Sequence, residues 1–357
     1  MTHPPLKVGV IGGGIGRTHL SGYRAQGNAV DVVALCDLNK GRLNTVADEF
    51  DIPLRYTDID RLLASGEVEA VSVCLPNHLH APVAIAALEA KLHVLCEKPL
   101  AENMGSAQKV VDAVEKASTK FMMCFNRRYR RDVQWMKQVV DTGQLGQIYQ
   151  VKAGWIRETG IPVGGWFSNK AMSGGGPLID LGVHVLDSVM WLLDYPAPLT
   201  VSGNVQANFG PRQIKTWGKP DPATSFDVED SATAFIRLDN DIILNLETSW
   251  ASHRKPGTDD IFITLLGTEG TVELHIANYA SQNTLTMYTE IGGVPVTTRP
   301  AVKETDGYDH QYVIAEFIQC INNDTPPTAP VTHGYAIMEM IDAIYQSAAA
   351  GCEVALA

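Results

Sequence analysis

The segment 177–193 combines an apolar helical pattern with three residues that could do proton chemistry. Asp180, His184 and Asp187 are spaced i, i+4 and i+7, which places them on one face of a helix. Because burying charge without partners is costly, that face must line a cavity or pair internally. A histidine can take a proton from a hydroxyl near neutral pH, and a carboxylate one turn away can orient it or bind a neighbouring hydroxyl. The spacing predicts that Asp180 and His184 form a catalytic pair.

Two other interpretations of this face are a purely structural ion pair and a carboxylate–histidine metal site. Lys98, in Glu97-Lys98-Pro99 after an apolar strand, favours catalysis. A lysine there can donate to a substrate oxygen and stabilise negative charge as a hydroxyl loses its proton, although a solvated turn lysine is the alternative. Pro99 would fix the backbone, and a cis bond before it is our hypothesis. No metal-ligand motif accompanies these residues, so we predict no metal.

Lys98 is one of several chemically active residues that follow short apolar strands in the first third of the chain. The others follow strands at 8–11, 32–36, 71–74 and 121–125. In an open parallel sheet, ligands lie outside the carboxyl ends of the strands, so a dinucleotide should lie across these residues. The predicted cofactor-binding residues are Gly12, Gly13, Gly14, Ile15, Gly16, Asp37, Leu75, Pro76, Asn77, His80 and Glu97.

The glycine turn and the acid after the second strand indicate the cofactor. Gly12-Gly13-Gly14-Ile15-Gly16 lets the backbone approach a pyrophosphate at a helix N-terminus, although Arg17 takes the place of the usual third glycine. An ordinary glycine turn is the alternative, and the strand, helix and later acid favour the cofactor. Asp37 can accept hydrogen bonds from a ribose diol and would repel a 2′-phosphate. Leu38 follows it and Arg42 lies one turn further on, so we predict NAD rather than NADP.

Substrate contacts are predicted for seven residues, of which three are the catalytic candidates. Asn126 and Arg127 follow the fifth strand and could bind a polyhydroxylated ring or pair with acids between domains. Aromatic and arginine side chains beyond residue 150, Tyr308 among them, could form a sugar-binding wall, with core packing or subunit contact as the alternative. The seven residues are Lys98, Asn126, Arg127, Arg157, Trp166, Asp180 and His184.

Two domains must position these residues. Residues 6–125 alternate short β-rich runs with helical stretches, which indicates βαβ units and a parallel Rossmann sheet. Beyond Gly146 come seven β-rich stretches with turn residues between them, which favours an open, mainly antiparallel sheet. We therefore expect an α/β plus α+β protein with a dinucleotide-binding domain at 1–127 and a substrate-binding and oligomerisation domain at 128–357. The closing helices, 311–322 and 334–349, are expected to pack back on the first domain.

Bulk composition excludes several classes of function. The chain has 357 residues, 45% of them apolar and 19% charged, as in soluble globular proteins of two domains. Its net charge of −12 disfavours nucleic acid and anionic membranes as partners. With no apolar run of membrane-spanning length and no secretory leader, a cytoplasmic location is expected. The six cysteines lack metal-like spacing and are predicted to be reduced, structural thiols.

In this order the motifs resemble the glucose–fructose oxidoreductase/inositol dehydrogenase/MocA family over nearly the whole chain. The resemblance rests on the glycine turn, on 75–80, on Glu97-Lys98-Pro99-Leu100, on 174–180 with His184, and on 342–347. It implies a Rossmann domain, an open antiparallel sheet that mediates dimers or tetramers in relatives, and redox chemistry at one carbon of a sugar or inositol ring. The family's catalytic lysine, aspartate and histidine map onto Lys98, Asp180 and His184.

We therefore expect an NAD-dependent dehydrogenase of a sugar, inositol or related polyol, acting as a homodimer or homotetramer. The resemblance also admits a glycoside-cleaving enzyme that retains NAD for a transient oxidation. A transhydrogenating sugar oxidoreductase with tightly bound nucleotide is a further alternative. A non-catalytic redox or metabolite sensor is disfavoured, because Lys98, Asp180 and His184 are all present.

Overall fold

A computed structural model describes residues 4–162, 164–219, 225–303 and 309–356. Contacts between residues divide the chain into two compact units. The first comprises Met1–Asn126 and Gly307–Met338, and the second comprises Arg127–Asp306 and Glu339–Ala357. The long helix α10 (Val331–Ala350) passes from one unit into the other.

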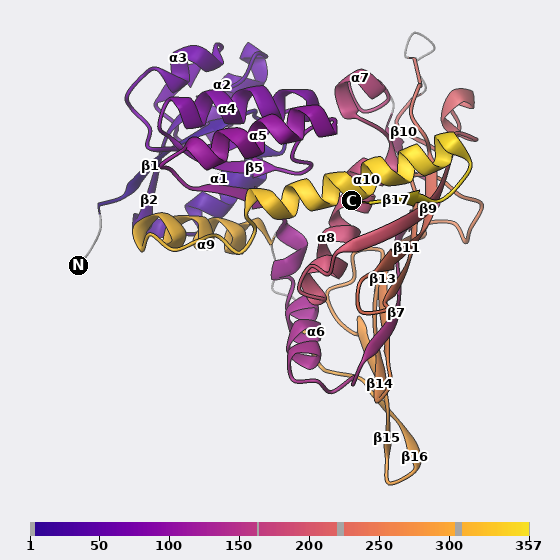
Figure 1. The fold of residues 1–357 in the computed structure, drawn as a ribbon. Helices are drawn as coiled ribbons and strands as arrows, with labels where there is room; N and C mark the ends of the chain where they lie inside the picture. Colours follow the sequence, from indigo (N-terminus) through magenta and orange to yellow (C-terminus); the bar gives the residue numbers. More distant parts are fainter. Residues whose placement is uncertain (1–3, 163, 220–224, 304–308, 357) are drawn as a thin grey trace. The chain divides into compact units, whose positions relative to one another are not determined.

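The first unit is built on a six-stranded parallel sheet in the order β3-β2-β1-β4-β5-β6, which confirms the predicted parallel Rossmann sheet and adds the strand β3 to the five that the sequence indicated. Helices α4 and α5 pack beside one another, and α9, from the C-terminal part of the chain, packs beside α1 (Figure 1). The strands are β1 (Leu6–Ile11), β2 (Val30–Cys36), β3 (Leu54–Tyr56), β4 (Ala70–Val73), β5 (His93–Glu97) and β6 (Phe121–Cys124). The helices are α1 (Gly16–Arg24), α2 (Lys40–Glu49), α3 (Ile59–Leu63), α4 (His80–Glu89), α5 (Met104–Lys116) and α9 (His310–Asn322).

Local sequence explains why these elements form where they do. The central strands β1 and β4 are almost entirely apolar and buried, as expected for parallel strands covered on both faces. Asn39, Asp58 and Asn103 each accept a hydrogen bond from a backbone N–H in the first turn of the helix that follows. Because the strands are parallel, their carboxyl ends lie at one edge of the sheet. The predicted cofactor residues come directly after these strand ends in the sequence.

The second unit contains a nine-stranded sheet in the order β16-β15-β14-β13-β7-β12-β11-β9-β17. All its strand pairs are antiparallel except β7 with β12, which confirms the mainly antiparallel prediction. Sequence analysis did not predict the exposed edge strand β16, which forms a hairpin with β15 (Figure 1). The strands are β7 (Ile148–Arg157), β9 (Pro198–Gln206), β11 (Ser231–Leu238), β12 (Ile243–Ser249), β13 (Asp259–Gly267), β14 (Gly270–Ala277), β15 (Leu285–Ile291), β16 (Val294–Thr298) and β17 (Val354–Ala355).

A small parallel pair and several helices complete this unit. The pair joins β8 (Ile161–Pro162) to β10 (Thr216–Trp217). The helices are α6 (Arg131–Asp141), α7 (Lys170–Ser173), the π-helical turn η4 (Leu178–Gly182) and α8 (Val183–Leu192). The segment predicted as one helix over 177–193 is thus a π turn followed by an α-helix. Such π turns are rare and are often found at functional sites.

Asp187, the third polar residue of that segment, pairs within the protein. Its carboxylate accepts hydrogen bonds from the Arg128 guanidinium at 2.5 and 2.9 Å and from the Tyr195 hydroxyl at 2.7 Å. The side chains of Arg128 and Asp187 are each 1% exposed. This contact joins α8 to the segment before α6, so we assign Asp187 to the structure of the second unit.

Two further features of the fold bear on the sequence analysis. The six cysteines are all free, and Cys352 is the exposed one. Among the described helices, none is both apolar and long enough to span a lipid bilayer.

Candidate active site

The glycine turn between β1 and α1 has the shape that a dinucleotide pyrophosphate requires. Gly12 has a φ of +101°, and a Cβ there would lie 2.1 Å from the carbonyl oxygen of Cys74. A Cβ at Gly16, the first residue of α1, would lie 2.9 Å from Val10, whereas one at Gly14 would meet nothing within 4 Å. The first and last glycines are therefore required by close packing. Gly14 leaves open space over the helix N-terminus, where an anionic group binds favourably.

Asp37 follows β2 and is joined to the glycine turn. Its buried carboxylate accepts hydrogen bonds from the Gly13 N–H at 2.8 Å and from Arg42 Nε at 2.6 Å and Nη2 at 2.9 Å. Burial would raise the pKa of Asp37, but these hydrogen bonds outweigh burial and lower it. The carboxylate is thus ionised beside the turn. The sequence placed Arg42 one helical turn away, and the structure brings its guanidinium onto the carboxylate.

The loop after β4 is held to the loop after β5 by His80. The ring of His80, which begins α4, contacts the Leu75 carbonyl oxygen through Nε2 at 2.7 Å and the Pro99 carbonyl oxygen through Nδ1 at 2.6 Å. Burial lowers the pKa of His80, although both carbonyl contacts favour the protonated ring. Asn77 is buried nearby in the short helix η2 (Asn77–Leu79). His80 therefore fixes the two loops in which several cofactor residues were predicted.

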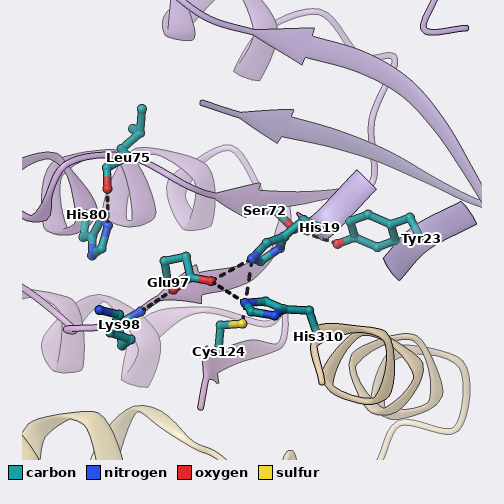
Figure 2. A network of polar contacts seen from close by, with 9 residues as sticks. All are labelled: His19, Tyr23, Ser72, Leu75, His80, Glu97, Lys98, Cys124 and His310. Carbon is teal, nitrogen blue, oxygen red and sulfur yellow. Dashed lines mark hydrogen bonds and ion pairs between the residues drawn. The ribbon is translucent and has the colours of Figure 1, made fainter. Parts of the chain in front are cut away.

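Lys98 directly follows the last residue of β5, and its peptide bond to Pro99 is cis, as hypothesised. The Lys98 N–H donates to Glu97 Oε2 at 3.2 Å, and Glu97 is buried beneath the turn (Figure 2). Lys98 itself is half-buried. The first unit thus contributes Lys98 to the candidate site. The backbone turn that carries this lysine is held by hydrogen bonds to the side chains of Glu97 and His80.

Asp180 lies in the π turn and His184 in the first turn of α8, both within the second unit. Both residues are half-buried, in a segment whose apolar residues are almost all buried. Asp180 Oδ2 accepts a hydrogen bond from the indole Nε1–H of Trp250 at 3.0 Å. The His184 ring lies against Trp155, with ring centroids 5.8 Å apart. Each member of the proposed acid–base pair is therefore positioned by a tryptophan.

The glycines before the π turn are closely packed within the second unit. A Cβ at Gly175 would lie 1.9 Å from Tyr345 Oη, and one at Gly176 would lie 1.9 Å from the Glu229 carbonyl oxygen. The buried Glu229 carboxylate also accepts hydrogen bonds from the Leu178 N–H at 3.1 Å and from Tyr345 Oη at 2.9 Å. Glu229 therefore anchors the start of the segment that carries Asp180.

Arg157 and Arg127 gather around Trp155, next to His184. Their guanidinium carbons lie 5.2 and 4.9 Å from the indole centroid, and Arg157 Nε donates to Asp259 at 3.0 Å. The Trp155 Nε1–H donates to the same carboxylate at 2.7 Å. The structure thus brings two predicted substrate residues together with His184 in one aromatic and cationic cluster.

The remaining substrate candidates are placed elsewhere. Trp166 stacks on Phe167 with ring centroids 3.9 Å apart. Asn126 begins the short helix η3 (Asn126–Tyr129) and belongs to the first unit, whereas Arg127 belongs to the second. Tyr308 lies outside the described residues.

Sequence reasoning missed several residues that shape the site. Trp250 ends a predicted strand and could have been noted as an aromatic residue at a strand end, but nothing local links it to Asp180. Only in the folded chain do His19 and His310 contact Glu97, and Ser72 contact His19. One group of possible metal ligands occurs among the described residues: His19, Glu97, Cys124 and His310, with ligand atoms within 4.8 Å of one another.

Comparisons with known proteins agree with this architecture. A model of an oxidoreductase family with an NAD-binding Rossmann fold, GFO/IDH/MocA, matches residues 6–125, and the model of its C-terminal alpha/beta domain matches residues 137–356. The chain is 32% identical to D-glucoside 3-dehydrogenase of Escherichia coli, covering 100% of this chain and 99% of that protein. It is 27% identical to inositol 2-dehydrogenase of Salmonella typhimurium, covering 97% and 95% of the two chains.

Solved structures show the same fold. A levoglucosan dehydrogenase in complex with NADH and levoglucosan superposes with a TM-score of 0.87 at 24% identity, over 98% of this chain and 99% of that one. An oxidoreductase domain protein from Kribbella flavida gives a TM-score of 0.89 at 22% identity, over 99% and 100% of the two chains. Together with the glycine turn and the two-unit fold, these matches show that the chain belongs to the GFO/IDH/MocA family of NAD-binding oxidoreductases.

Proposed function

We propose that this protein oxidises one ring hydroxyl of a sugar, inositol or related polyol, with NAD as the hydride acceptor and Lys98, Asp180 and His184 as its catalytic residues. The observation that carries the proposal is the pair on the π turn and α8. Asp180 and His184 are half-buried polar groups in an apolar segment, each held by a tryptophan, in a chain whose other unit is an NAD-binding fold.

The chain's own residues would move the proton. The His184 imidazole takes the proton of the reacting hydroxyl, and general-base assistance of this kind contributes about 10²–10⁴-fold. The Lys98 ammonium donates to the same oxygen and stabilises the charge that develops there. Asp180 orients the imidazole or binds a neighbouring hydroxyl, while Trp250 holds its carboxylate. NAD, when bound, accepts the hydride from the oxidised carbon.

The residues of the first unit suit NAD. The space over Gly14 and the N-terminus of α1 fits a pyrophosphate, and the ionised Asp37 can accept hydrogen bonds from a ribose diol. A negative charge at that place disfavours a 2′-phosphate, so we propose NAD over NADP. The Arg42 side chain is half exposed, so it can move aside and leave one side of the Asp37 carboxylate for the ribose diol.

Pyranosides of D-glucose are the first substrates to test. The relative that is 32% identical over the full length is named D-glucoside 3-dehydrogenase, and others are named for inositol and levoglucosan. All three substrate types are rings with several hydroxyl groups. Arg127 and Arg157, next to His184, offer the hydrogen-bond donors that such a ring needs.

Reduction of NAD tests the function directly. The protein is incubated with methyl D-glucosides, levoglucosan and myo-inositol, with NAD and NADP in parallel, and the absorbance of the reduced nicotinamide is followed. We expect turnover with NAD on at least one ring. His184→Asn and Lys98→Met should each lower kcat by about 10²-fold or more while NAD still binds. Exposed His275→Asn and Lys109→Met serve as matched controls. Full activity of both site variants would refute the assignment.

The alternative reactions give different outcomes in the same experiment. Hydrolysis of an aryl glucoside without net NAD reduction would indicate a glycoside-cleaving enzyme. Nucleotide that stays bound through purification, with a second sugar needed for turnover, would indicate a transhydrogenating oxidoreductase. NAD binding with none of these activities would indicate a sensor.

The open sheet of the second unit is our candidate for an oligomer interface. Residues of β7, β9, β11 and β12, together with Ser347 and Glu353, line a hollow of about 800 Å³ on one face. We propose a homodimer or homotetramer formed through this face. Light scattering of the purified protein, with Phe235→Glu as the disrupting variant, tests this proposal, and a monomeric wild-type protein would refute it.

A further inference from the structure

A buried hydrogen-bond network lies beneath the turn that carries Lys98. Glu97 Oε2 accepts the Lys98 N–H, and Glu97 Oε1 lies 2.9 Å from Nε2 of His19 and 3.3 Å from Nε2 of His310 (Figure 2). His19 comes from α1 and His310 from α9, and their ring centroids lie 5.3 Å apart where the two helices pack beside one another. One carboxylate thus connects the lysine's backbone to two helices of the first unit.

The donors and acceptors of this network can be assigned consistently. Tyr23 Oη lies 2.8 Å from Ser72 Oγ, and Ser72 Oγ lies 3.1 Å from His19 Nδ1. If Tyr23 donates to Ser72 and Ser72 donates to Nδ1, the neutral His19 ring carries its proton on Nε2 and donates to Glu97. Every contact in this chain then joins one donor to one acceptor.

The charges in the network agree with this assignment. Burial would raise the pKa of Glu97, but hydrogen bonds from His19 and His310 outweigh burial and hold the pKa well below its usual range. Burial lowers the pKa of His19 in spite of the neighbouring carboxylate. Glu97 is therefore an anion that accepts from ring N–H groups, and such charge-assisted hydrogen bonds are stronger than neutral ones.

We propose that His19 and His310 are positioning residues that fix Lys98 through Glu97. The proposal rests on the proposed function of Lys98 as the group that holds the reacting oxygen. A lysine has four rotatable bonds, so its ammonium can be placed reproducibly only if its backbone is fixed. His310 lies 213 positions from Glu97 in sequence, so helix α9, from the C-terminal part of the chain, contributes to placing the residue that follows β5.

A metal ion held by the same side chains is the competing explanation. Two ligands of tetrahedral zinc, each about 2.0–2.1 Å from the metal, stand about 3.3 Å apart. The 2.9 Å between His19 Nε2 and Glu97 Oε1 is instead the usual length of an N–H···O hydrogen bond. A hydrogen bond therefore accounts better for the contact between His19 and Glu97. The 3.3 Å between His310 Nε2 and Glu97 Oε1 fits both explanations, and the metal content of the purified protein distinguishes them.

Substitution of His310 tests the proposal. His310→Phe keeps a ring but removes the N–H, and should lower kcat about 10- to 100-fold with KM for NAD within about threefold of wild type. His310→Gln places an amide N–H where Nε2 was and should restore most of kcat. Ile314→Ala on the same helix removes buried packing without touching Glu97, so it controls for general loosening of α9.

A double-mutant cycle separates positioning from structure. In a Lys98→Met background, His310→Phe should lower the residual turnover no further, because there is no ammonium left to place. An effect of the same size in both backgrounds would overturn the proposal. The proposal would also be overturned if Lys98→Met abolished activity while His310→Phe kept the kcat of the wild type.

Full activity of Lys98→Met would show that the proposed function of Lys98 is wrong. A measurement that does not depend on turnover still tests whether His310 fixes the backbone of Lys98 in that case. Amide hydrogen exchange of the segment 94–104 reports directly on the Lys98 N–H and its neighbours. Exchange should be faster in His310→Phe, and near wild type in His310→Gln and Ile314→Ala. Equal exchange in all four proteins would overturn the proposal. One equivalent of zinc in the purified protein, lost on His310→Phe, would establish the metal site instead.

Discussion

Replacing Asp37 with serine should move the cofactor preference of this protein from NAD towards NADP. In the structure the carboxylate is bound by Gly13 and Arg42 at the end of β2. Serine removes the negative charge, keeps an oxygen that can accept the Gly13 N–H, and releases the Arg42 guanidinium for a 2′-phosphate. Since the Arg42 side chain is half exposed, its guanidinium stays in contact with water when the carboxylate is removed, so the fold should tolerate the change.

Two terms set the size of the shift. Loss of a charge-assisted hydrogen bond from the ribose diol costs about 1.5–3 kcal/mol, which lowers kcat/KM with NAD about 10- to 100-fold. Two unit charges about 4 Å apart repel by about 4 kcal/mol near a protein surface, and exposure to solvent and salt reduces this to about 1–2 kcal/mol. Removing that repulsion raises kcat/KM with NADP about 10-fold. The preference for NAD should therefore fall by about 10²–10³-fold.

The assay is kcat/KM for NAD and NADP at a saturating concentration of the best sugar. Asp31→Ser, at the exposed start of the same strand, is the control and should change neither value. Arg42→Ala alone should leave kcat/KM with NAD nearly unchanged. The double variant, Asp37→Ser with Arg42→Ala, should lose most of the increase in kcat/KM with NADP that Asp37→Ser alone shows. Unchanged use of NAD by Asp37→Ser, or an NADP gain that does not depend on Arg42, would refute this reasoning.

Three further predictions follow from buried contacts. Trp250→Phe removes the hydrogen bond to Asp180 and should lower kcat about 10-fold in steady-state kinetics, with NAD affinity unchanged. Asp187→Asn leaves the buried Arg128 without its carboxylate and should lower the free energy of urea unfolding by about 3–5 kcal/mol. Because the pKa of Glu97 is lowered on folding, its stabilising effect is present above its ordinary pKa of 4.5 and is lost as the pH falls through its folded pKa. Glu97→Gln should therefore lose less stability than wild type between about pH 5 and pH 3, as measured by denaturant titration.

Each of these predictions can be contradicted by a specific result. A kcat of Trp250→Phe equal to wild type would mean that the indole only fills space. A loss below about 1 kcal/mol for Asp187→Asn, as expected for the exposed control Asp194→Asn, would mean that the ion pair is replaceable. Parallel stability curves for Glu97→Gln and wild type at acid pH would mean that Glu97 keeps its ordinary pKa in the folded protein.

The sequence by itself determined the fold class and the candidate residues whose signals are local. A glycine turn between a strand and a helix, an acid after the next strand, and a histidine four residues after an aspartate can all be read within a short window. They depend on the periods of strands and helices and on the tight backbone of the turn. For the same reason the parallel sheet of the first unit and the mainly antiparallel sheet of the second were predicted correctly.

Only the tertiary structure decided which side chains surround those candidates. Trp250 lies 70 positions after Asp180, and His310 lies 213 positions after Glu97. The three titratable residues of 177–193 are equivalent by helical spacing, but the fold pairs Asp187 with Arg128 and inserts a π turn at Asp180. Hydrogen-bond partners depend on which elements pack together across the chain, and that choice comes from burying the whole apolar surface rather than from any local pattern.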